Sequence, residues 1–315
     1  MTTLNSFVEA ELEYRREMWV ALLSAGGPRA VAPQLLREIR VYGGAQGIWV
    51  DQARTGSLTE DGNGIAVGLL HTGRSYPDEL SEDGVIYHYP STNRPGERDL
   101  NEVEATKHVK QLGLPVFVIT HPSVGSSKRD VRLAWVEDWD DDYGAFLVAF
   151  GDQPPAARGD VDDSPFQLEA SSSRVTREVS TTPGQQRFKF RVLQWYGPSC
   201  AVCGMDVPEL LDAAHIRPRG KRGSDDPCNG LVLCALHHRA LDAGLFAIHP
   251  GTLEIYCRPS GPDAAELAIV HPTLDHLRSK PHRDALEWFW NWWRRGQRAS
   301  ALATKGDANG LPRES

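Results

Sequence analysis

The sequence predicts an α+β protein with two domains, a β-rich domain followed by a smaller metal-braced one. Its 315 residues are enough for two hydrophobic cores. Between residues 41 and 150, apolar residues come in short runs rich in β-branched and aromatic side chains, separated by Gly, Pro, Asn and Asp, as strands do. Four of the five cysteines lie between Cys200 and Cys234. In a reducing compartment, such clustering favours metal ligation over disulfides.

The first domain begins with a predicted helix. Apolar residues recur at helical spacing in "FVEAELEYRREMWVALLSA", and Gly26, Gly27 and Pro28 end the pattern. We assign residues 1–40 to this N-terminal helical segment. Residues 41–152 form the β-rich domain, with predicted strands in "GIWVD", "GIAVGLL", "VIYHYP", "LPVFVIT", "VRLAWVEDW" and "AFLVAF". One helix, "NEVEATKHVKQLG", interrupts the strands and ends at Gly113.

Residues 153–180 are predicted to be a linker, since "GDQPPAARGDVDDSPFQLEASSSRV" is rich in Pro, Ser and charge and poor in apolar residues. The second domain spans 181–300 and begins with a helix in "TPGQQRFKFRVLQWYG". "LFAIHPGTLEIYCRP" predicts two strands around a Pro-Gly turn, and "HRDALEWFWNWWRRG" predicts a helix whose tryptophans pack into a core. Residues 301–315 are expected to be a disordered tail.

Charge is unevenly distributed along the chain. The net charge is −8, yet residues 174–222 hold nine Arg or Lys against four Asp or Glu, which suits a phosphate partner for the second domain. The first twenty residues contain no unbroken apolar stretch, and no segment reaches membrane-spanning length. We therefore expect a cytoplasmic protein, free of the membrane.

Two pairs of residues have the spacing of zinc ligands. Cys200 and Cys203 are separated by two residues, as are Cys234 and His237. A two-residue gap lets both side chains of one tight turn reach the same ion, and four such ligands complete a tetrahedral structural zinc site. Cys228 and Cys257 lack a partner at this spacing, and we expect ordinary packed thiols there.

A second set of side chains remains in the same segment. His215 lies in "LLDAAHI", a predicted strand, and Asn229 lies in the following loop. His238 and Asp242 are four residues apart in "ALHHRALDAGL", so on a helix they share one face and can bind one ion. Hydrolysis of a phosphodiester needs a neutral imidazole to activate water and a hard divalent cation, and this set offers both.

Residues 185–249 resemble the HNH nuclease family, through "DAAHIRP", "NGLVL" and "HHRALDAGL". The resemblance implies a ββα-metal fold with one Mg²⁺ or Mn²⁺ ion. It implies His215 as the general base, Asn229 as the residue that holds the loop and orients this histidine, and His238 and Asp242 as ligands of the catalytic ion. Asp212, three residues before the base, would be a further contact to that ion. The zinc knuckle used by many members would be built from Cys200, Cys203, Cys234 and His237. Where many members have Asp immediately before the base, this sequence has Ala214.

The first domain contains "HTGRSYPDELSEDGVIYHYPSTNRPGERDL", in which Tyr76 and Tyr89 flank the carboxylates of Asp78 and Glu79. Such tyrosines can be core residues, or they can stack on a base removed from the duplex. The stretch from 41 to 120 resembles the SRA (YDG) domain, which implies a twisted, PUA-like β-barrel that flips 5-methylcytosine or 5-hydroxymethylcytosine. Tyr76 and Tyr89 would then stack on the base, and Asp78 or Glu79 would accept a hydrogen bond from its amino group. The spacing departs from the family by one extra residue before Gly84, and Pro90 replaces a common Thr.

Together these resemblances predict a bacterial modification-dependent restriction endonuclease, acting on double-stranded DNA that carries modified cytosine. Double-strand cleavage by one nuclease site needs a homodimer or two binding events, and the Trp-rich helix offers a dimer surface. A first alternative is an HNH endonuclease whose N-terminal domain reads unmodified sequence or N6-methyladenine. A second is a zinc-stabilised DNA-binding protein without turnover.

Overall fold

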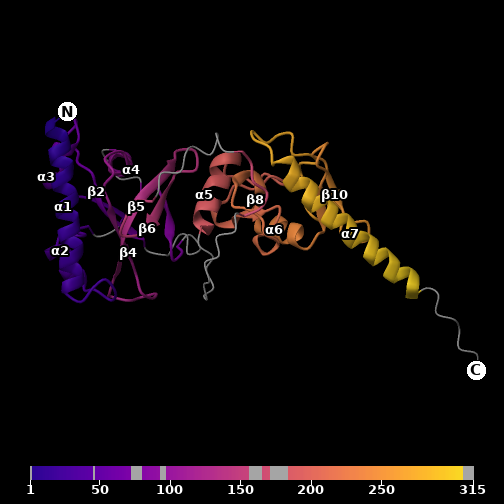
Figure 1. Ribbon diagram of the computed structural model, residues 1–315, viewed down its shortest axis with the longest axis horizontal. Helices are drawn as coiled ribbons and strands as arrows, with labels where there is room; N and C mark the ends of the chain where they lie inside the picture. The colour runs from indigo at the N-terminus through magenta and orange to yellow at the C-terminus, as the bar shows by residue number, and fades with distance from the viewer. Residues whose placement is uncertain are drawn as a thin grey trace, which may run out of the picture. The chain divides into compact units, whose positions relative to one another are not determined.

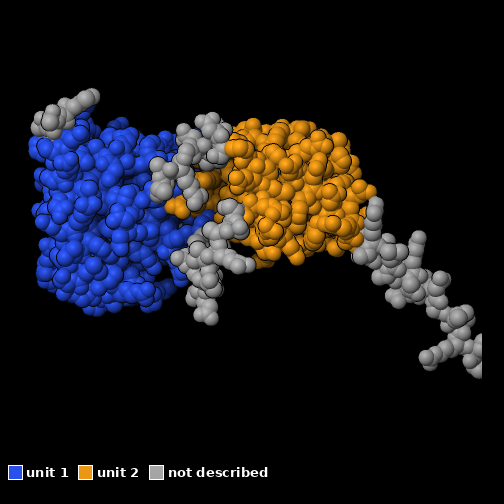
Figure 2. Space-filling view, viewed as in Figure 1, with its two compact units in different colours: residues 1–158, 179–186 blue, residues 159–178, 187–315 orange. Residues whose placement is uncertain are grey.

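The computed structural model describes residues 2–44, 47–71, 80–92, 97–155, 165–170 and 184–307. The chain divides into two compact units: residues 1–158 with 179–186, and residues 159–178 with 187–315 (Figure 2). The mixture of helices and strands confirms the α+β class. No helix in the described ranges is long and apolar enough to cross a membrane.

Unit 1 is built on one mixed sheet of six strands in the order β1-β2-β4-β5-β6-β3 (Figure 1). All pairs are antiparallel except β2 with β4. The strands are β1 (Gly47–Val50), β2 (Ala66–His71), β3 (Gly84–His88), β4 (Val116–Thr120), β5 (Asp130–Asp140) and β6 (Ala145–Phe150). The helices are α1 (Thr2–Ser24), α2 (Pro33–Glu38), α3 (Gln52–Thr55) and α4 (Arg98–Gln111). The six predicted strands and the two predicted helices are therefore present.

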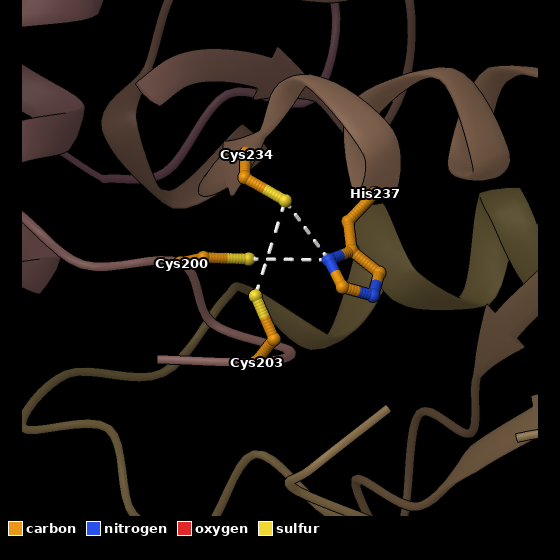
Figure 3. Close-up of side chains that lie close together, drawn as sticks. All are labelled: Cys200, Cys203, Cys234 and His237. Carbon is orange, nitrogen blue, oxygen red and sulfur yellow. Dashed lines mark hydrogen bonds between the residues drawn. The ribbon is translucent and has the colours of Figure 1, made fainter. Parts of the chain in front are cut away.

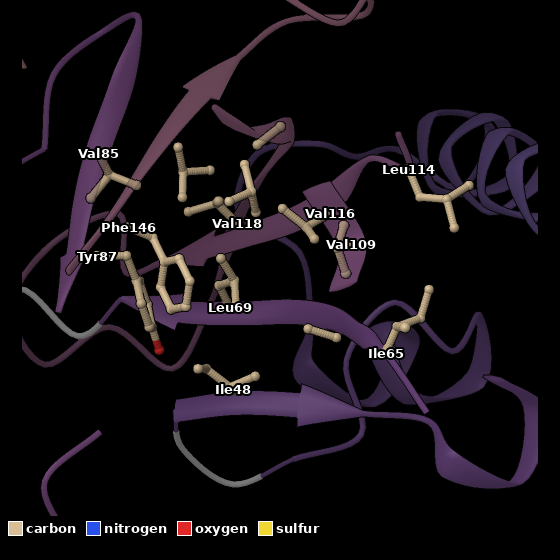
Figure 4. Close-up of a cluster of buried hydrophobic side chains, with 14 of the residues drawn as sticks. Ile48, Ile65, Leu69, Val85, Tyr87, Val109, Leu114, Val116, Val118 and Phe146 are labelled. Atoms are coloured by element: carbon tan, nitrogen blue, oxygen red, sulfur yellow. The ribbon is translucent and has the colours of Figure 1, made fainter. Parts of the chain in front are cut away.

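The sheet curls on itself. β3 is four places from β2 in the strand order, yet the Tyr87 hydroxyl donates a hydrogen bond to the Leu70 carbonyl at 3.3 Å. The concave side holds a core in which Leu69, Val118 and Phe146 pack with residues of α4 (Figure 4). The other side is covered by α1 and α2, through residues such as Met18 and Leu36. The result is a half-barrel, and the closed SRA-type barrel remains a prediction.

Two β-bulges explain why side chains change face within single strands. Trp49 pairs with Gly68 but Val50 pairs with Ala66, which leaves Val67 as an extra residue. A second register shift, between Val136 and Asp138, has the same effect in β5. An extra residue reverses the alternation of inward and outward side chains and bends the strand, which helps the sheet to curl.

In its described residues, unit 2 contains two small hairpins and three α-helices. Its elements are α5 (Gln185–Tyr196, of which Gln185 and Gln186 are grouped with unit 1), β7 (Leu211–His215), β8 (Gly230–Cys234), α6 (Ala235–Asp242), β9 (Phe246–Ile248), β10 (Ile255–Cys257) and α7 (Arg283–Asp307). The predicted hairpin around the Pro-Gly turn is β9 and β10. In the Trp-rich α7, Trp293 is buried and its indole donates to the Gly244 carbonyl at 2.9 Å, which confirms a core role for this tryptophan.

Two boundaries differ from the sequence prediction. α7 continues to Asp307, seven residues past the predicted end of the second domain at 300. Residues 165–170, placed in the predicted linker, are attached to unit 2, since Glu169 forms a β-bridge with Gly223 and Ser224 donates its N–H to the Leu168 carbonyl at 3.2 Å. This part of the predicted linker is therefore grouped with unit 2.

Candidate metal centre and nuclease site

The candidate site is built on a ββα unit. β7 and β8 pair antiparallel, with Leu211 opposite Cys234 and His215 opposite Gly230, and α6 follows β8 without a break. Every residue of β8 is buried, as is Leu211 at the start of β7, so the hairpin forms because its apolar residues pack beneath the helix. The arrangement places His215 at one end of the hairpin and His238 on the helix.

Cys200, Cys203, Cys234 and His237 come together as the sequence predicted (Figure 3). Their donor atoms all lie within 4.8 Å of one another. Within the described residues, no other set of three or more His, Cys, Asp or Glu side chains brings its donor atoms this close together. The Sγ atoms of Cys203 and Cys234 are 3.9 Å apart, and Cys200 Sγ is 3.5 Å from His237 Nδ1. A zinc tetrahedron with Zn–S near 2.3 Å has edges of about 3.8 Å between sulfurs and about 3.6 Å between sulfur and nitrogen. The four side chains therefore fit one zinc ion.

The surroundings of the cluster also favour a cation. His237 is fully buried, and its Nε2 lies 2.9 Å from the Leu267 carbonyl, so this nitrogen carries the proton and Nδ1 presents its lone pair to the thiols. Burial and the neighbouring thiols raise the pKa of Cys203 to about 12. Three thiolates at this spacing repel one another unless a cation shares the site. Gly204 closes the first ligand turn with φ at +73°, a conformation that glycine adopts without strain.

His238 lies between two carboxylates. Its Nδ1 is 3.1 Å from Asp212 Oδ2, and its Nε2 is 3.7 Å from Asp242 Oδ2. The hydrogen bond with Asp212 raises the pKa of His238, against the effect of burial, and the same bond lowers the pKa of Asp212. Asp212 and Asp242 therefore face opposite nitrogens of one ring. His238 Nε2 and Asp242 can share a small cation, while Asp212 is placed to hold the ring.

His215 is held by a different set of contacts. Its Nε2 is 3.1 Å from Asp225 Oδ1, and its ring stacks on Phe188 with centroids 3.6 Å apart and planes inclined by 12°. Arg219 donates to both oxygens of Asp225, from Nε and Nη2, at 2.6 Å each. The imidazole side chain is 16% exposed, so it is restrained on two sides but open to solvent.

Asn229 is fully buried in the loop between β7 and β8. Its Oδ1 accepts the N–H of Arg217 at 3.0 Å, and its Nδ2 donates to the carbonyls of Arg217 and Ser224 at 3.1 and 2.9 Å. Its own carbonyl accepts the N–H of Ile216, next to His215, at 2.8 Å. One side chain thus fixes both ends of the loop that follows His215.

The structure brings the predicted nuclease residues into two groups on one ββα unit, Asp212 with His238 and Asp242, and His215 with its loop. Asp225, which contacts His215 directly, and Arg219, which holds Asp225, were not predicted from the sequence. The signal available was their position in "RPRGKRGSDDPCNG", the loop that joins the two motif halves. Cys228 and Cys257 are half-buried thiols outside the Cys/His cluster.

The predicted base pocket of unit 1 is described only at Tyr89, because Tyr76, Asp78 and Glu79 lie outside the described residues. Tyr89 packs on Phe146 with ring centroids 4.7 Å apart, and its hydroxyl donates to Asp141 at 2.9 Å. A cavity of about 710 Å³ lies at β1 and the start of α4. Trp49 and the nearly buried Glu102 are in its wall, so an aromatic face and a carboxylate occur together there.

Comparison with known proteins supports the nuclease reading of unit 2. The family model described as HNH endonuclease matches residues 200–249, from the first zinc-type cysteine through α6 to His249. A search of curated proteins finds no match. Among solved structures, the chain is similar to one titled "Modification dependent TagI restriction endonuclease", with 20% identity over 82% of this chain and 89% of that chain and a TM-score of 0.32. The match to the family model identifies residues 200–249 as an HNH endonuclease domain, and the protein that carries them is a nuclease.

Proposed function

We propose that the protein is a modification-dependent DNA endonuclease, in which unit 1 recognises modified cytosine and unit 2 hydrolyses a nearby phosphodiester bond. The observation that supports it most is the pairing of two separate constellations on one ββα unit. One is a Cys/His tetrahedron with zinc dimensions, and the other contains an open imidazole and a His–Asp pair. Zinc would brace the fold, and Mg²⁺ or Mn²⁺ would serve the chemistry.

In this proposal His215 removes a proton from the attacking water. Stacking on Phe188 and the contact to Asp225 keep its ring in one orientation, and Asn229 fixes the loop that carries Asp225. His238 and Asp242 hold the divalent cation, which when bound stabilises negative charge on the scissile phosphate. Asp212 accepts the N–H of His238 Nδ1, so that Nε2 is left with its lone pair toward Asp242.

Recognition of modified cytosine rests on the motif of unit 1, and the pocket can be tested at two places. Tyr89 is the described member of the motif, whereas Trp49 lies in the cavity beside Glu102. We expect Tyr89→Ala to weaken binding of a duplex with one 5-methylcytosine, because base stacking on an aromatic ring contributes about 1–3 kcal/mol. Trp49→Ala is the matched aromatic truncation. If it weakens binding of the duplex more than Tyr89→Ala does, the modified base binds in the cavity rather than at Tyr89.

Cleavage of one plasmid prepared in four forms tests the proposed function: unmodified, with 5-methylcytosine, with 5-hydroxymethylcytosine and with N6-methyladenine, each with Mg²⁺ or Mn²⁺. We expect cleavage of one or both cytosine-modified forms and none of the unmodified plasmid. Equal cleavage of all four forms would remove the modification dependence while leaving the nuclease. Nicked product from monomer and linear product only at higher protein concentration would indicate that two chains cut the two strands.

A further inference from the structure

We propose that Asp225 is a positioning residue for the general base, held in turn by Arg219, so that the nuclease site contains an Arg219–Asp225–His215 relay of contacts. The inference rests on the proposed function in one respect, that His215 is the base. It adds a carboxylate partner, Asp225, that lies outside the three motif segments "DAAHIRP", "NGLVL" and "HHRALDAGL". The three side chains come from β7 and the loop that follows it, within 11 residues of sequence.

The contact fixes which nitrogen of His215 can take a proton. A carboxylate only accepts hydrogen bonds, so the Nε2 that lies 3.1 Å from Asp225 Oδ1 carries a hydrogen. The neutral ring then has its lone pair on Nδ1, the nitrogen that remains for the water. Phe188 covers one face of the ring at a centroid distance of 3.6 Å, which opposes rotation about the side-chain bonds. Together these contacts select one tautomer and one orientation.

Asp225 is itself prepared for this role. Arg219 holds both carboxylate oxygens at 2.6 Å, in the two-pronged geometry that guanidinium and carboxylate groups favour. Partial burial works to raise the pKa of Asp225, but the hydrogen bonds from His215 and Arg219 outweigh it and hold the pKa below its usual value. The carboxylate is therefore charged at neutral pH, where it stabilises a protonated His215.

The loop that carries Arg219 and Asp225 is closed tightly. Gly223 lies so near the turn that a Cβ there would be 1.8 Å from the Arg217 carbonyl oxygen, which excludes any side chain. The Asn229 side chain forms hydrogen bonds with the backbone of Arg217 and Ser224. The backbone of Glu169 forms a β-bridge with Gly223 of the same loop. The Asp225 carboxylate is thus positioned by backbone that is fixed before substrate binds, which limits the reorganisation needed during the reaction.

The chemical step follows from this geometry. The water O–H bond breaks as its proton moves to His215 Nδ1, the water oxygen forms a bond to phosphorus, and the P–O bond to the leaving oxygen breaks. His215 becomes an imidazolium whose Nε2–H remains hydrogen-bonded to the Asp225 carboxylate, so the pair carries no net charge. The proton later passes from His215 to solvent or to the leaving oxygen, and Asp225 keeps its charge throughout.

The test compares single-turnover cleavage of a modified duplex by the full-length zinc-loaded protein and five variants. Asp225→Asn keeps the size and an accepting oxygen but removes the charge. We expect a 10- to 100-fold lower rate at saturating DNA, the effect typical of removing a residue that orients a functional histidine. The acidic limb of the rate profile should move to lower pH, because the imidazolium loses its counterion. Arg219→Lys keeps the charge but loses the two-pronged contact, and should give a smaller decrease. Asp206→Asn, an exposed carboxylate of the same unit, is the matched control and should cleave like wild type.

Unchanged rate and pH profile in Asp225→Asn, with His215→Ala inactive, would overturn this inference and leave the proposed function intact. Full activity of His215→Ala would instead remove the proposed function itself. A slower Asp225→Asn with an unmoved pH profile would assign Asp225 a structural role only and would also refute the proposal. Zinc content and thermal melting of each variant separate these outcomes from misfolding, and Asp225→Glu, which restores the charge, should recover part of the lost rate.

Discussion

Replacing Cys203 with serine tests whether the Cys/His cluster is a zinc site that supports the nuclease unit. Cys203 is the least buried of the three cluster cysteines, so the nearly isosteric serine changes packing little. Its Sγ lies 3.9 Å from Cys234 Sγ, at one edge of the tetrahedron. The substitution therefore removes one zinc ligand while the others stay in place.

The magnitude follows from the number of ligands. Binding of structural zinc contributes about 10–16 kcal/mol in small domains, so one ligand of four accounts for about 3–4 kcal/mol if they share equally. That corresponds to zinc affinity weaker by about 10²- to 10³-fold. This weaker zinc binding should lower the melting temperature of unit 2 by roughly 10 °C, taking about 3–4 °C per kcal/mol for a unit of this size.

Native mass spectrometry and calorimetry measure both effects. We expect one zinc per chain in wild type and little or none in Cys203→Ser after dialysis against a weak chelator. Cys228→Ser and Cys257→Ser are matched controls, because these half-buried thiols lie outside the cluster and should keep the zinc and the melting temperature. Equal zinc content in Cys203→Ser and wild type would refute the reasoning, as would zinc loss in the two control variants.

Three further predictions concern residues of the nuclease site. Asn229→Ala leaves three buried backbone groups unpaired and should lower the free energy of unfolding by about 3–6 kcal/mol, measured in urea; a cost below 1 kcal/mol would mean that the loop is not held by this side chain. Phe188→Leu keeps most of the volume and should cost less than about 1.5 kcal/mol of stability while slowing cleavage several-fold, because His215 loses its flat stacking partner; the idea fails if cleavage is unaffected. The pKa of His238 is raised in the folded protein, so in the absence of Mg²⁺ and Mn²⁺ its ion pair with Asp212 stabilises the fold. This stabilisation is fully present below pH 6.5 and disappears as the pH rises through the raised pKa. Asp212→Asn should therefore destabilise more at pH 6 than at pH 9, and an equal effect at both values would contradict the ion pair.

The local patterns of the sequence predicted the elements well. Strands were predicted because β-branched and aromatic residues gather in short runs bounded by turn residues. The helix of His238 and Asp242 was expected from their four-residue spacing, and the ββα unit as a whole was implied by the resemblance to the HNH family. The zinc-type cluster was found because two-residue gaps restrict how two ligands can lie. In each case the information lies within a few neighbouring residues.

What the sequence did not predict depends on contacts between distant or irregular segments. The bulges at Val67 and Glu137 reverse the alternation of faces, and nothing in the local composition marks them. Asp225 meets His215 only because the loop folds back through Gly223, and Asp212 faces the opposite ring nitrogen of His238 from Asp242 because of how α6 lies on the hairpin. Motif spacing identifies such residues as a set but does not assign their partners.

We propose that His215 activates the water that cleaves DNA, on a unit braced by a separate zinc. Cleavage of a plasmid carrying modified cytosine by wild type and His215→Ala, with Mg²⁺ and with zinc content measured on the same samples, tests it most directly. We predict that the variant keeps one zinc per chain and binds the DNA as wild type does, while its cleavage rate falls by about 10²- to 10⁴-fold. Undiminished cleavage by a zinc-loaded His215→Ala protein would contradict the claim.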